Sequence, residues 1–290
     1  MSPRLGIAAL LLIATIFGAN HVAARIAFDH GASVSAAVTV RSAATALVLF
    51  LMLRALRVPL GLARGNLPRA LAVGVLVAIQ SYCLYSSVAR IPVALALLVF
   101  NVYPMLFMFL AAATGKEKLK PRALVAMPVA LAGLALVLDV RIDGWTDRWR
   151  ELGEGVAWGL GAGVSFALVL FCNAHWLKQM DGRVRTLLMM VVTATLMLAL
   201  GASAGTLALP RDGTGWIGLA LLTLLYGIAI TSLFIVLPKV GGGAASTVAL
   251  NFEPIAVIGI AWLALGQGFA PLQLAGAFVV VGAIAWLSLR

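Results

Sequence analysis

Apolar stretches, each about twenty residues long, follow one another along this chain, and a stretch of that length crosses a bilayer as an α-helix. This feature constrains the fold more than any other. Because 63% of the 290 residues are hydrophobic and only 11% are charged, a water-soluble fold could not bury the apolar surface. The residue alternation of a membrane β-barrel is absent. The sequence therefore predicts an all-α integral membrane protein.

The chain contains ten such stretches, and most connections between them are short, so consecutive helices are expected to be antiparallel neighbours. The first stretch is longer than the core of a signal peptide, and no small-residue cleavage site follows it, so it is expected to be retained as a span. The ten expected spans are Leu5–Phe28, Ser33–Leu53, Arg69–Ala89, Val93–Ala113, Pro121–Leu138, Gly153–Cys172, Thr186–Leu207, Trp216–Leu237, Gly243–Leu265 and Pro271–Leu289.

Basic residues indicate the orientation of the chain, because Lys and Arg collect in cytoplasmic loops. With the N-terminus in the cytoplasm, the inner loops carry more than twice as many Lys and Arg residues as the outer loops. Both termini are therefore expected to be cytoplasmic. These loops also account for the net charge of +11, and no nucleic acid partner is expected.

A broken span near the C-terminus has a counterpart near the middle of the chain. Ala244–Leu265 is interrupted by Asn251-Phe252-Glu253-Pro254, and Val93–Ala113 is interrupted by Asn101-Val102-Tyr103-Pro104, 150 residues earlier. A proline removes one helix hydrogen bond and bends a helix, so both spans are predicted to be kinked. The expected hinges are Pro104, Pro254, Gly241, Gly242 and Gly243.

The repeat continues without a gap from these breaks to Pro121 and Pro271. Each copy has five spans, an odd number, so the two copies must lie upside down relative to each other. Inverted repeats of this kind are typical of secondary transporters, with the substrate site near the bilayer midplane. The expected organisation is a first repeat over residues 1–138, a periplasmic linker over 139–152 and a second repeat over 153–290.

With these features the chain resembles the drug/metabolite transporter (DMT) superfamily, EamA family. The resemblance rests on the two five-span copies, on Phe17-Gly18-Ala19-Asn20 in the first span, on the breaks at Pro104 and Pro254, and on Gly115-Lys116-Glu117-Lys118-Leu119. It covers nearly the whole chain. Gln267 stands where Glu117 would recur in the second copy, so a role of Glu117 is not duplicated.

The whole sequence further resembles the bacterial YddG-type aromatic amino acid exporters. The resemblance implies a multi-pass protein of the bacterial inner membrane that moves small metabolites out of the cytoplasm. Aromatic amino acids would be the leading substrates, with other neutral amino acids as further candidates. The mode of energy coupling does not follow from it.

Glu253 is the sharpest candidate for a functional residue, because a carboxylate at the centre of a span costs about 2.5–3.5 kcal/mol on insertion scales. Two interpretations stand. Glu253 faces a wet central cavity, where it binds a substrate ammonium group or cycles a proton, or it forms an intramembrane ion pair with Arg41 that locks helices together.

Other polar and aromatic residues within spans are candidates for the same cavity. Asn101 and Asn251 precede the two breaks, where an amide can satisfy a freed carbonyl or reach a ligand. A tyrosine in a span either faces a cavity or lies in the core with its hydroxyl satisfied, and Tyr82 is favoured for the cavity. The expected cavity residues are Asn20, Gln80, Tyr82, Asn101, Tyr103, Trp158, Tyr226, Asn251 and Glu253.

Three further groups of residues are expected to have structural roles. His21, Arg25 and Asp29 share one face at the outer end of the first span and are interpreted as an outer gate or interface cluster. Gly155, Gly159 and Gly163 favour close helix packing. The residues expected at the membrane interface are Trp145, Trp149, Trp176, Trp216, Trp262 and Trp286.

No phosphate-binding loop, HExxH, GxSxG or catalytic pair of carboxylates is present, so an enzyme is not expected, nor any cofactor or metal. The expected partners are an amino acid substrate and the lipid bilayer, and a monomer is compatible with the sequence. The alternatives are an exporter of other metabolites or drugs, a passive channel or scaffold, and an intramembrane enzyme acting on lipid. Phosphorylated or lipid-linked sugars would require more buried cations than Arg41 alone.

Overall fold

The computed structural model describes residues 3–59, 66–116, 121–137, 145–240, 249–250, 252–268 and 270–288, and within these residues the regular structure is helical throughout. The helices are α1 (Pro3–Asp29), α2 (Val34–Ala55), α3 (Leu67–Arg90), α4 (Val93–Phe100), α5 (Tyr103–Ala113), α6 (Pro121–Val137), α7 (Trp145–Trp176), α8 (Gly182–Ser203), α9 (Gly213–Val240), α11 (Glu253–Leu265) and α12 (Pro271–Ser288).

Seven segments of the described chain are long and apolar enough to cross a membrane, so this is a multi-pass membrane protein. They are Arg4–Asp29, Val34–Ala55, Leu67–Arg90, Val93–Ala113, Leu152–Trp176, Gly182–Ser203 and Gly213–Leu233. Three shorter apolar helices are Leu124–Val137, Glu253–Leu265 and Pro271–Trp286. Each of the ten predicted stretches overlaps one of these segments, although ten membrane crossings stay a prediction.

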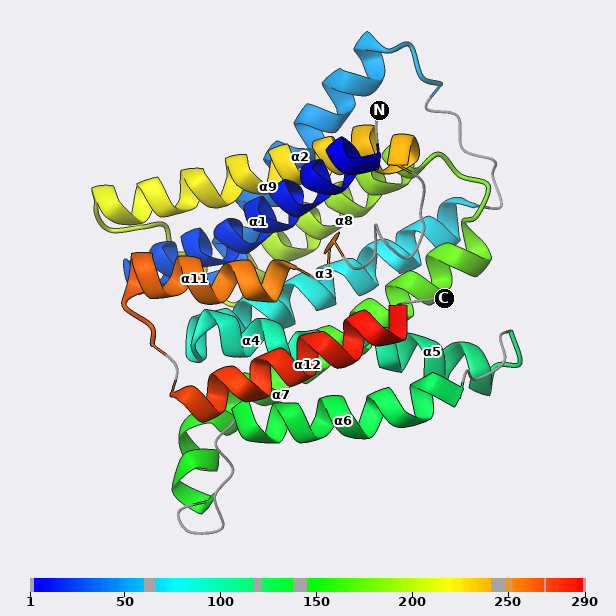
Figure 1. Ribbon diagram of the computed structural model, residues 1–290. Helices are drawn as coiled ribbons and strands as arrows, with labels where there is room; N and C mark the ends of the chain where they lie inside the picture. The colour runs from blue at the N-terminus through cyan, green and yellow to red at the C-terminus, as the bar shows by residue number, and fades with distance from the viewer. Residues whose placement is uncertain are drawn as a thin grey trace.

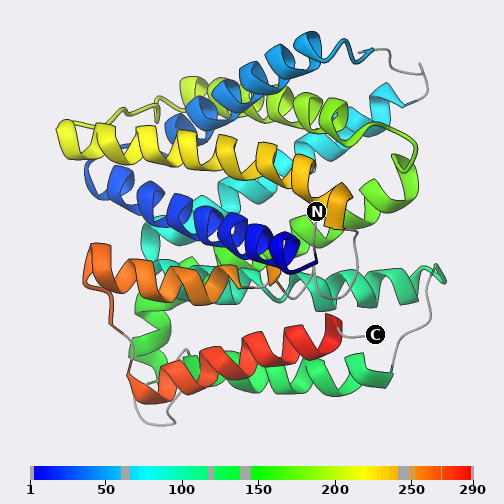
Figure 2. The same ribbon diagram turned by 45° about the horizontal axis from the view of Figure 1, so that its top comes forward.

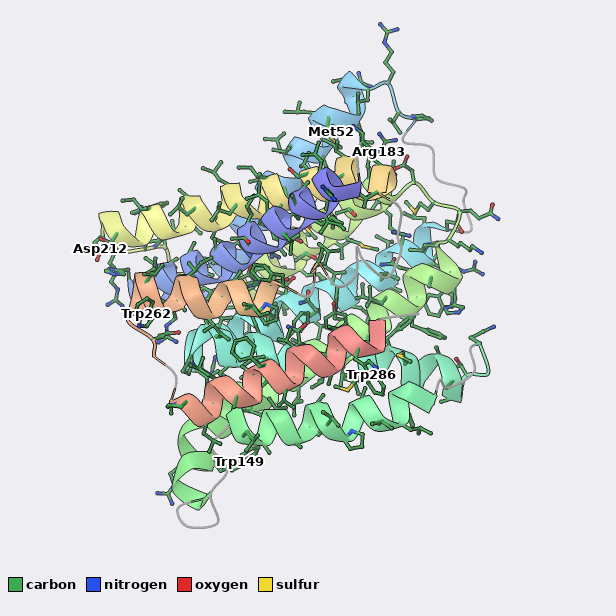
Figure 3. The ribbon with its side chains drawn as sticks, viewed as in Figure 1. Met52, Trp149, Arg183, Asp212, Trp262 and Trp286 are labelled. Atoms are coloured by element: carbon green, nitrogen blue, oxygen red, sulfur yellow. The ribbon has the colours of Figure 1, made fainter. Side chains whose placement is uncertain are left out.

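The helices lie side by side, with their long axes roughly aligned (Figure 1). α6 and α12 pack together at one edge of the bundle, and α2 lies at the opposite edge. The start of α1 and the end of α12 lie at the same end of the bundle (Figure 2). Trp262 and Trp286 lie toward opposite ends (Figure 3) and are 63% and 40% exposed, as expected for residues at two interfaces.

The packing partners are preserved when the two halves of the chain are exchanged. α1 packs against α9, and its counterpart α7 packs against α3, the counterpart of α9. In the same way α3 packs against α8, and α9 against α2. α2 pairs with its own counterpart α8, and α6 with α12. The contacts therefore have the two-fold character of a duplicated fold.

Both predicted breaks are present, but each lies before its proline. α4 ends at Phe100, where the Asn101 Nδ2 group donates to the Leu97 carbonyl oxygen at 2.8 Å. Pro104 and Pro254 are then the second residues of α5 and α11, where a missing N–H removes no intrahelical bond. The residues just before these helices, Val102 (φ −72°, ψ −12°) and Phe252 (φ −71°, ψ −17°), have nearly the same conformation.

Small residues bring the helices around the centre close together, as predicted. A Cβ atom added to Gly159 on α7 would lie 2.9 Å from Val99 Cγ1 and 3.2 Å from Ser87 Oγ. On α1, a Cβ atom at Gly18 would lie 2.9 Å from Val257 Cγ2 and 3.4 Å from the Glu253 carbonyl oxygen. Gly18 therefore lets the first turn of α11 lie directly against α1.

The segment between the two halves is more helical than expected. Helix α7 begins at Trp145, within the segment that the sequence analysis assigned to the linker. Residues 139–144 lie outside the described residues. The short helix α4 is buried on every side, because Val93–Val99 are all apolar. It packs against α7, α11 and α3.

Candidate functional site

A cavity of about 280 Å³ lies at the level of the two helix breaks. Its lining comes from both halves of the chain, and it combines the basic and acidic side chains of Arg41, His21 and Glu253 with an aromatic wall. From His21 it extends along α1 toward the start of that helix, past Phe17 and Ala14.

Two other hollows have volumes of about 410 Å³ and about 360 Å³. They lie in the grooves between α2 and α8 and between α2 and α9, and no charged side chain lines either of them. Their walls include Leu47, Phe50 and Leu224, which are 58%, 42% and 60% exposed. Apolar side chains on the outside of a membrane bundle face lipid, so the smaller central cavity is the candidate site.

Glu253 is paired with His21 and not with Arg41. The Glu253 Oε1 atom lies 3.1 Å from His21 Nε2, and both side chains are largely buried. α11 packs against α1 through Gly18, one helical turn from His21, whereas α2, which carries Arg41, packs mainly against α8 and α9. The expected Arg41–Glu253 ion pair is therefore corrected to a His21–Glu253 pair.

Arg41 is 3% exposed and is held by neutral groups. Its Nη1 group donates to the Tyr85 hydroxyl at 3.2 Å, and its Nη2 group donates to Ser81 Oγ at 3.1 Å. The guanidinium carbon lies 4.0 Å from the centre of the Tyr226 ring, a cation–π distance. The Tyr85 hydroxyl in turn donates to Asn20 Oδ1 at 3.3 Å.

Aromatic rings form the apolar wall of the cavity. The rings of Tyr103 and Phe166 meet edge to face with their centres 4.8 Å apart. Phe100 lies 5.1 Å from Tyr103 and 5.4 Å from Phe166 by the same measure. Such a cluster offers faces and edges against which a planar solute can pack. The cavity is therefore polar where Arg41 and Glu253 lie and apolar at this cluster.

Several predicted site residues come together here and others do not. Gln80, Asn101, Tyr103, Tyr226 and Glu253 line the cavity. Asn20 is buried beside it through its bond with Tyr85. Asn251, Gly241, Gly242 and Gly243 lie outside the described residues.

Tyr82 and Trp158 lie outside the cavity lining, contrary to the prediction. Tyr82 is 38% exposed, and its ring meets the Trp158 ring edge to face at 5.6 Å. Two residues along a helix turn the side chain by about 200°, so Tyr82 points away when Gln80 points in. Trp158 donates its Nε1–H to Glu154 at 3.3 Å. Helical spacing from Gln80 and Ser81 would have selected Leu84 and Tyr85 instead.

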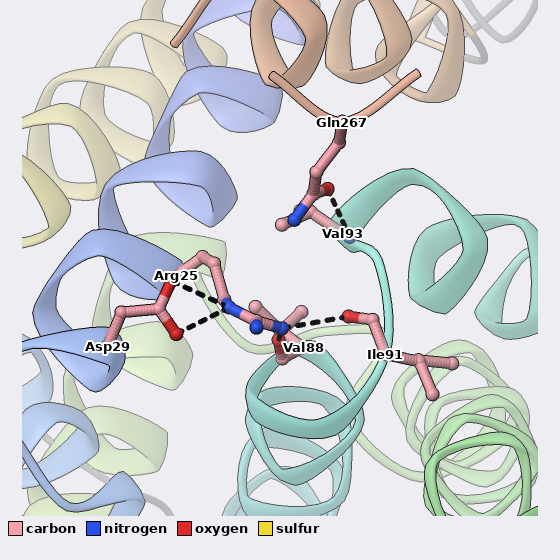
Figure 4. Close-up of polar contacts among 6 residues, drawn as sticks. All are labelled: Arg25, Asp29, Val88, Ile91, Val93 and Gln267. Carbon is pink, nitrogen blue, oxygen red and sulfur yellow. Dashed lines mark hydrogen bonds and ion pairs between the residues drawn. The ribbon is translucent and has the colours of Figure 1, made fainter. Parts of the chain in front are cut away.

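Four helices are joined just beyond one end of the cavity (Figure 4). Arg25, one turn after His21 on α1, donates from Nη1 to the carbonyl oxygens of Val88 at 3.1 Å and Ile91 at 3.2 Å. Its Nε group donates to Asp29 at 2.8 Å. The Val93 N–H donates to Gln267 Oε1 at 3.1 Å. These bonds link α1 to the end of α3, and the start of α4 to the segment after α11. They lie at the predicted outer gate or interface cluster, whose role stays a prediction, and we refer to the bonds of Arg25 as the Arg25 closure.

Comparison with known proteins places this geometry in a family. A solved structure titled "Crystal structure of protein" aligns with 99% of this chain and 96% of its own, with a TM-score of 0.64 and 16% sequence identity, and therefore shares the fold. No curated protein matches the chain. The EamA-like transporter family matches twice, over residues 4–139 and 153–289. The chain therefore belongs to the EamA-like transporter family, whose members are membrane transporters of the DMT superfamily.

Proposed function

We propose that this protein is a secondary transporter of the bacterial inner membrane that exports small amphipathic metabolites, most of all aromatic and other neutral amino acids. The observation that carries the proposal is the central cavity, in which buried charged groups and a cluster of aromatic rings lie together. An amphipathic solute needs both kinds of contact. The aromatic cluster of Phe100, Tyr103 and Phe166 favours a planar side chain over an aliphatic one.

The proposed architecture has ten spans in two inverted five-helix repeats, residues 1–138 and 153–290, with both termini in the cytoplasm. The matching conformations before α5 and α11 support it, as do the packing partners that survive exchange of the halves. With this orientation, the end of the bundle at which α1 starts faces the cytoplasm. The cavity then extends toward the cytoplasm, and the Arg25 closure lies on the periplasmic side.

The proposed mechanism is alternating access. In the state described, solute enters from the cytoplasm and binds between Glu253 and the aromatic cluster. Release requires that the bonds from Arg25 to Val88 and Ile91 open while the cytoplasmic side closes. The breaks before Pro104 and Pro254 are the proposed hinges, because the backbone there is not held in a continuous helix.

Reconstitution in liposomes tests this function. Purified full-length protein is inserted in liposomes, and uptake of labelled phenylalanine, tryptophan, leucine and a cationic drug is followed with and without a pH gradient. The expected result is saturable amino acid flux that unlabelled substrate on the opposite side accelerates. Flux that never saturates would indicate a passive channel, and flux of the drug alone would exclude the amino acid assignment.

Glu253 is expected to be essential for this flux. The substitution Glu253→Gln keeps the shape of the side chain but removes its negative charge, and with it the pairing with His21. Transport of amino acids is expected to fall at least tenfold, and any dependence on a pH gradient is expected to disappear. Glu154→Gln is the matched control, because Glu154 is exposed and pairs with Arg90 outside the cavity. Unchanged transport by Glu253→Gln would remove Glu253 from the mechanism.

A further inference from the structure

The central cavity contains a buried cation, Arg41, that has no counter-ion among the residues that the structure describes. Arg41 lies within the apolar segment Val34–Ala55 and is 3% exposed. Both groups that accept its hydrogen bonds, Ser81 Oγ and the Tyr85 hydroxyl, are neutral. The acid in the same cavity, Glu253, is paired with His21. A buried charge without a partner of opposite sign is unfavourable, so this site gains most from an anionic ligand.

The Arg41 guanidinium also keeps hydrogen-bonding capacity. A guanidinium carries five N–H bonds, of which one at Nη1 and one at Nη2 are used. The Nε group is buried and has no hydrogen-bond partner among the described residues. Arg41 lines the cavity, so we expect a ligand there to meet the unused N–H groups. A carboxylate matches that edge, because its two oxygens accept two parallel N–H bonds.

The Arg41 guanidinium is already oriented by its neighbours before a ligand binds. Hydrogen bonds to Ser81 and Tyr85 fix the two ends of the fork, and the Tyr226 ring packs on the guanidinium at 4.0 Å. Because these contacts set the orientation in advance, little side-chain entropy is lost when a ligand binds.

Tyr85 separates the positive and negative parts of the cavity. Its hydroxyl accepts the bond from Arg41, and its ring lies 5.6 Å from the ring of His21, which pairs with Glu253. An amino acid carries its carboxylate and its ammonium group on one carbon atom. A zwitterion placed over Tyr85 would direct the carboxylate toward Arg41 and the ammonium group toward Glu253.

We propose that Arg41 binds the carboxylate of the transported solute, and that the cavity therefore requires a carboxylate and rejects amines that lack one. This inference rests on the proposed function, since it assigns one end of the same substrate. It narrows the substrate class to carboxylates with an apolar or aromatic group and excludes cationic drugs that lack a carboxylate.

Binding of matched compounds to the detergent-purified full chain tests the assignment. L-Phenylalanine carries both charged groups, 3-phenylpropionate lacks the ammonium group, phenethylamine lacks the carboxylate, and benzoate and acetate are simple carboxylates. Affinities are measured by calorimetry, and flux is measured in liposomes. For the wild type, we expect 3-phenylpropionate to bind and phenethylamine to bind at least tenfold more weakly than phenylalanine. Equal binding of phenethylamine and phenylalanine overturns the proposal without any variant.

Variants separate the charge from the rest of the side chain. Arg41→Met keeps length and apolar packing but removes the donors, and we expect it to lose 3-phenylpropionate binding and most phenylalanine binding. Arg41→Lys keeps the charge without the fork and is expected to restore part of the carboxylate binding. Arg90→Met is the matched control, because Arg90 pairs with exposed Glu154 outside the cavity. Carboxylate binding that survives Arg41→Met in a folded protein refutes the assignment.

The outcomes distinguish this inference from the proposed function. If phenylalanine is transported but binds independently of its carboxylate, the function stands and the Arg41 site fails. If no amino acid is transported, yet benzoate or acetate binds to the wild type and not to Arg41→Met, the Arg41 site stands and the amino acid assignment fails.

Discussion

Removal of the Arg25 side chain is expected to open the closed end of the cavity. Arg25 on α1 donates to the carbonyl oxygens of Val88 and Ile91, which belong to the end of α3 and the connection to α4. Arg25→Met keeps a flexible apolar stem but cannot form either bond. The closed state therefore loses two interactions that the open state does not have, and the equilibrium between them shifts.

The size of the shift follows from the contacts. Hydrogen bonds from a charged donor contribute roughly 1.5–3 kcal/mol each when water does not compete. The Arg25 side chain is 21% exposed, and one nitrogen serves both carbonyls, so about 1 kcal/mol for each bond is appropriate. The total of about 2 kcal/mol corresponds to a roughly 30-fold rise in the population of the open state relative to the closed one.

Cysteine labelling measures this population. Leu84 lines the cavity one helical turn inside Val88, and Leu84→Cys in a background without Cys83 and Cys172 provides a single reporter. The labelling rate with a membrane-impermeant maleimide, added from the side on which α1 ends, follows the open state. We expect a tenfold or greater increase in the Arg25→Met background. Arg90→Met is the control, because Arg90 lies at the same end but pairs with Glu154, and it should label as slowly as the parent. Equal labelling rates in the parent and in Arg25→Met would refute the role of Arg25 in closing this end.

Two further predictions concern packing and pH. Gly159→Ala is expected to lower stability by about 1 kcal/mol or more through overpacking, because the new Cβ atom would lie 2.9 Å from a neighbouring side chain. Gly227→Ala is the control, because a Cβ atom added there would meet no neighbouring atom within 4 Å, and it should leave the melting temperature in detergent unchanged. Equal melting temperatures of the two variants would contradict the packing argument. In the loop before α9, the backbone N–H of Gly215 and then His30 hold the pKa of Asp212 below its usual range. A lowered folded-state pKa means that this contribution is present above the ordinary pKa of an aspartate and is lost as the pH falls through the folded value. Asp212→Asn should therefore lower the melting temperature at pH 6 and change it little at pH 2, and a loss of the same size at both pH values would contradict this.

Periodicity and composition were sufficient to predict where the helices of this fold lie, but not which side chains make contact in the site. The apolar stretches predicted where helices lie because the bilayer sets their length. The repeated Asn-x-x-Pro pattern likewise predicted an interruption near Pro104. The predicted kink from a lost hydrogen bond is instead a break before the proline, because Pro104 occupies the first turn of a new helix. Helix ends were less predictable, and α7 begins within the expected linker because nothing in Trp145–Leu152 stops a helix.

The partners of the ionisable residues depend on which helices meet, and one sequence does not contain that information. Glu253 lines the cavity, but its partner is His21 and not the expected Arg41, because Gly18 allows α11 to approach α1. Tyr82 was favoured over Tyr85 because it follows Gln80 closely in sequence. Helical geometry reverses that order, since Tyr85 lies on the face of α3 that carries Ser81, and Tyr82 does not.

The contacts at the closed end have a consequence for the energetics of the cycle. In a duplicated transporter with identical halves, the inward-facing and outward-facing forms would be related by a two-fold rotation and would have the same free energy. Here Gln267, which stands where the first copy has Glu117, bonds to Val93. The position 150 residues after Arg25 is His175, which bonds within its own helix to the Phe171 carbonyl oxygen at 2.8 Å. The contacts at these two positions therefore differ between the halves, and under the proposed mechanism we expect the inward-facing and outward-facing forms of the empty protein to differ in free energy.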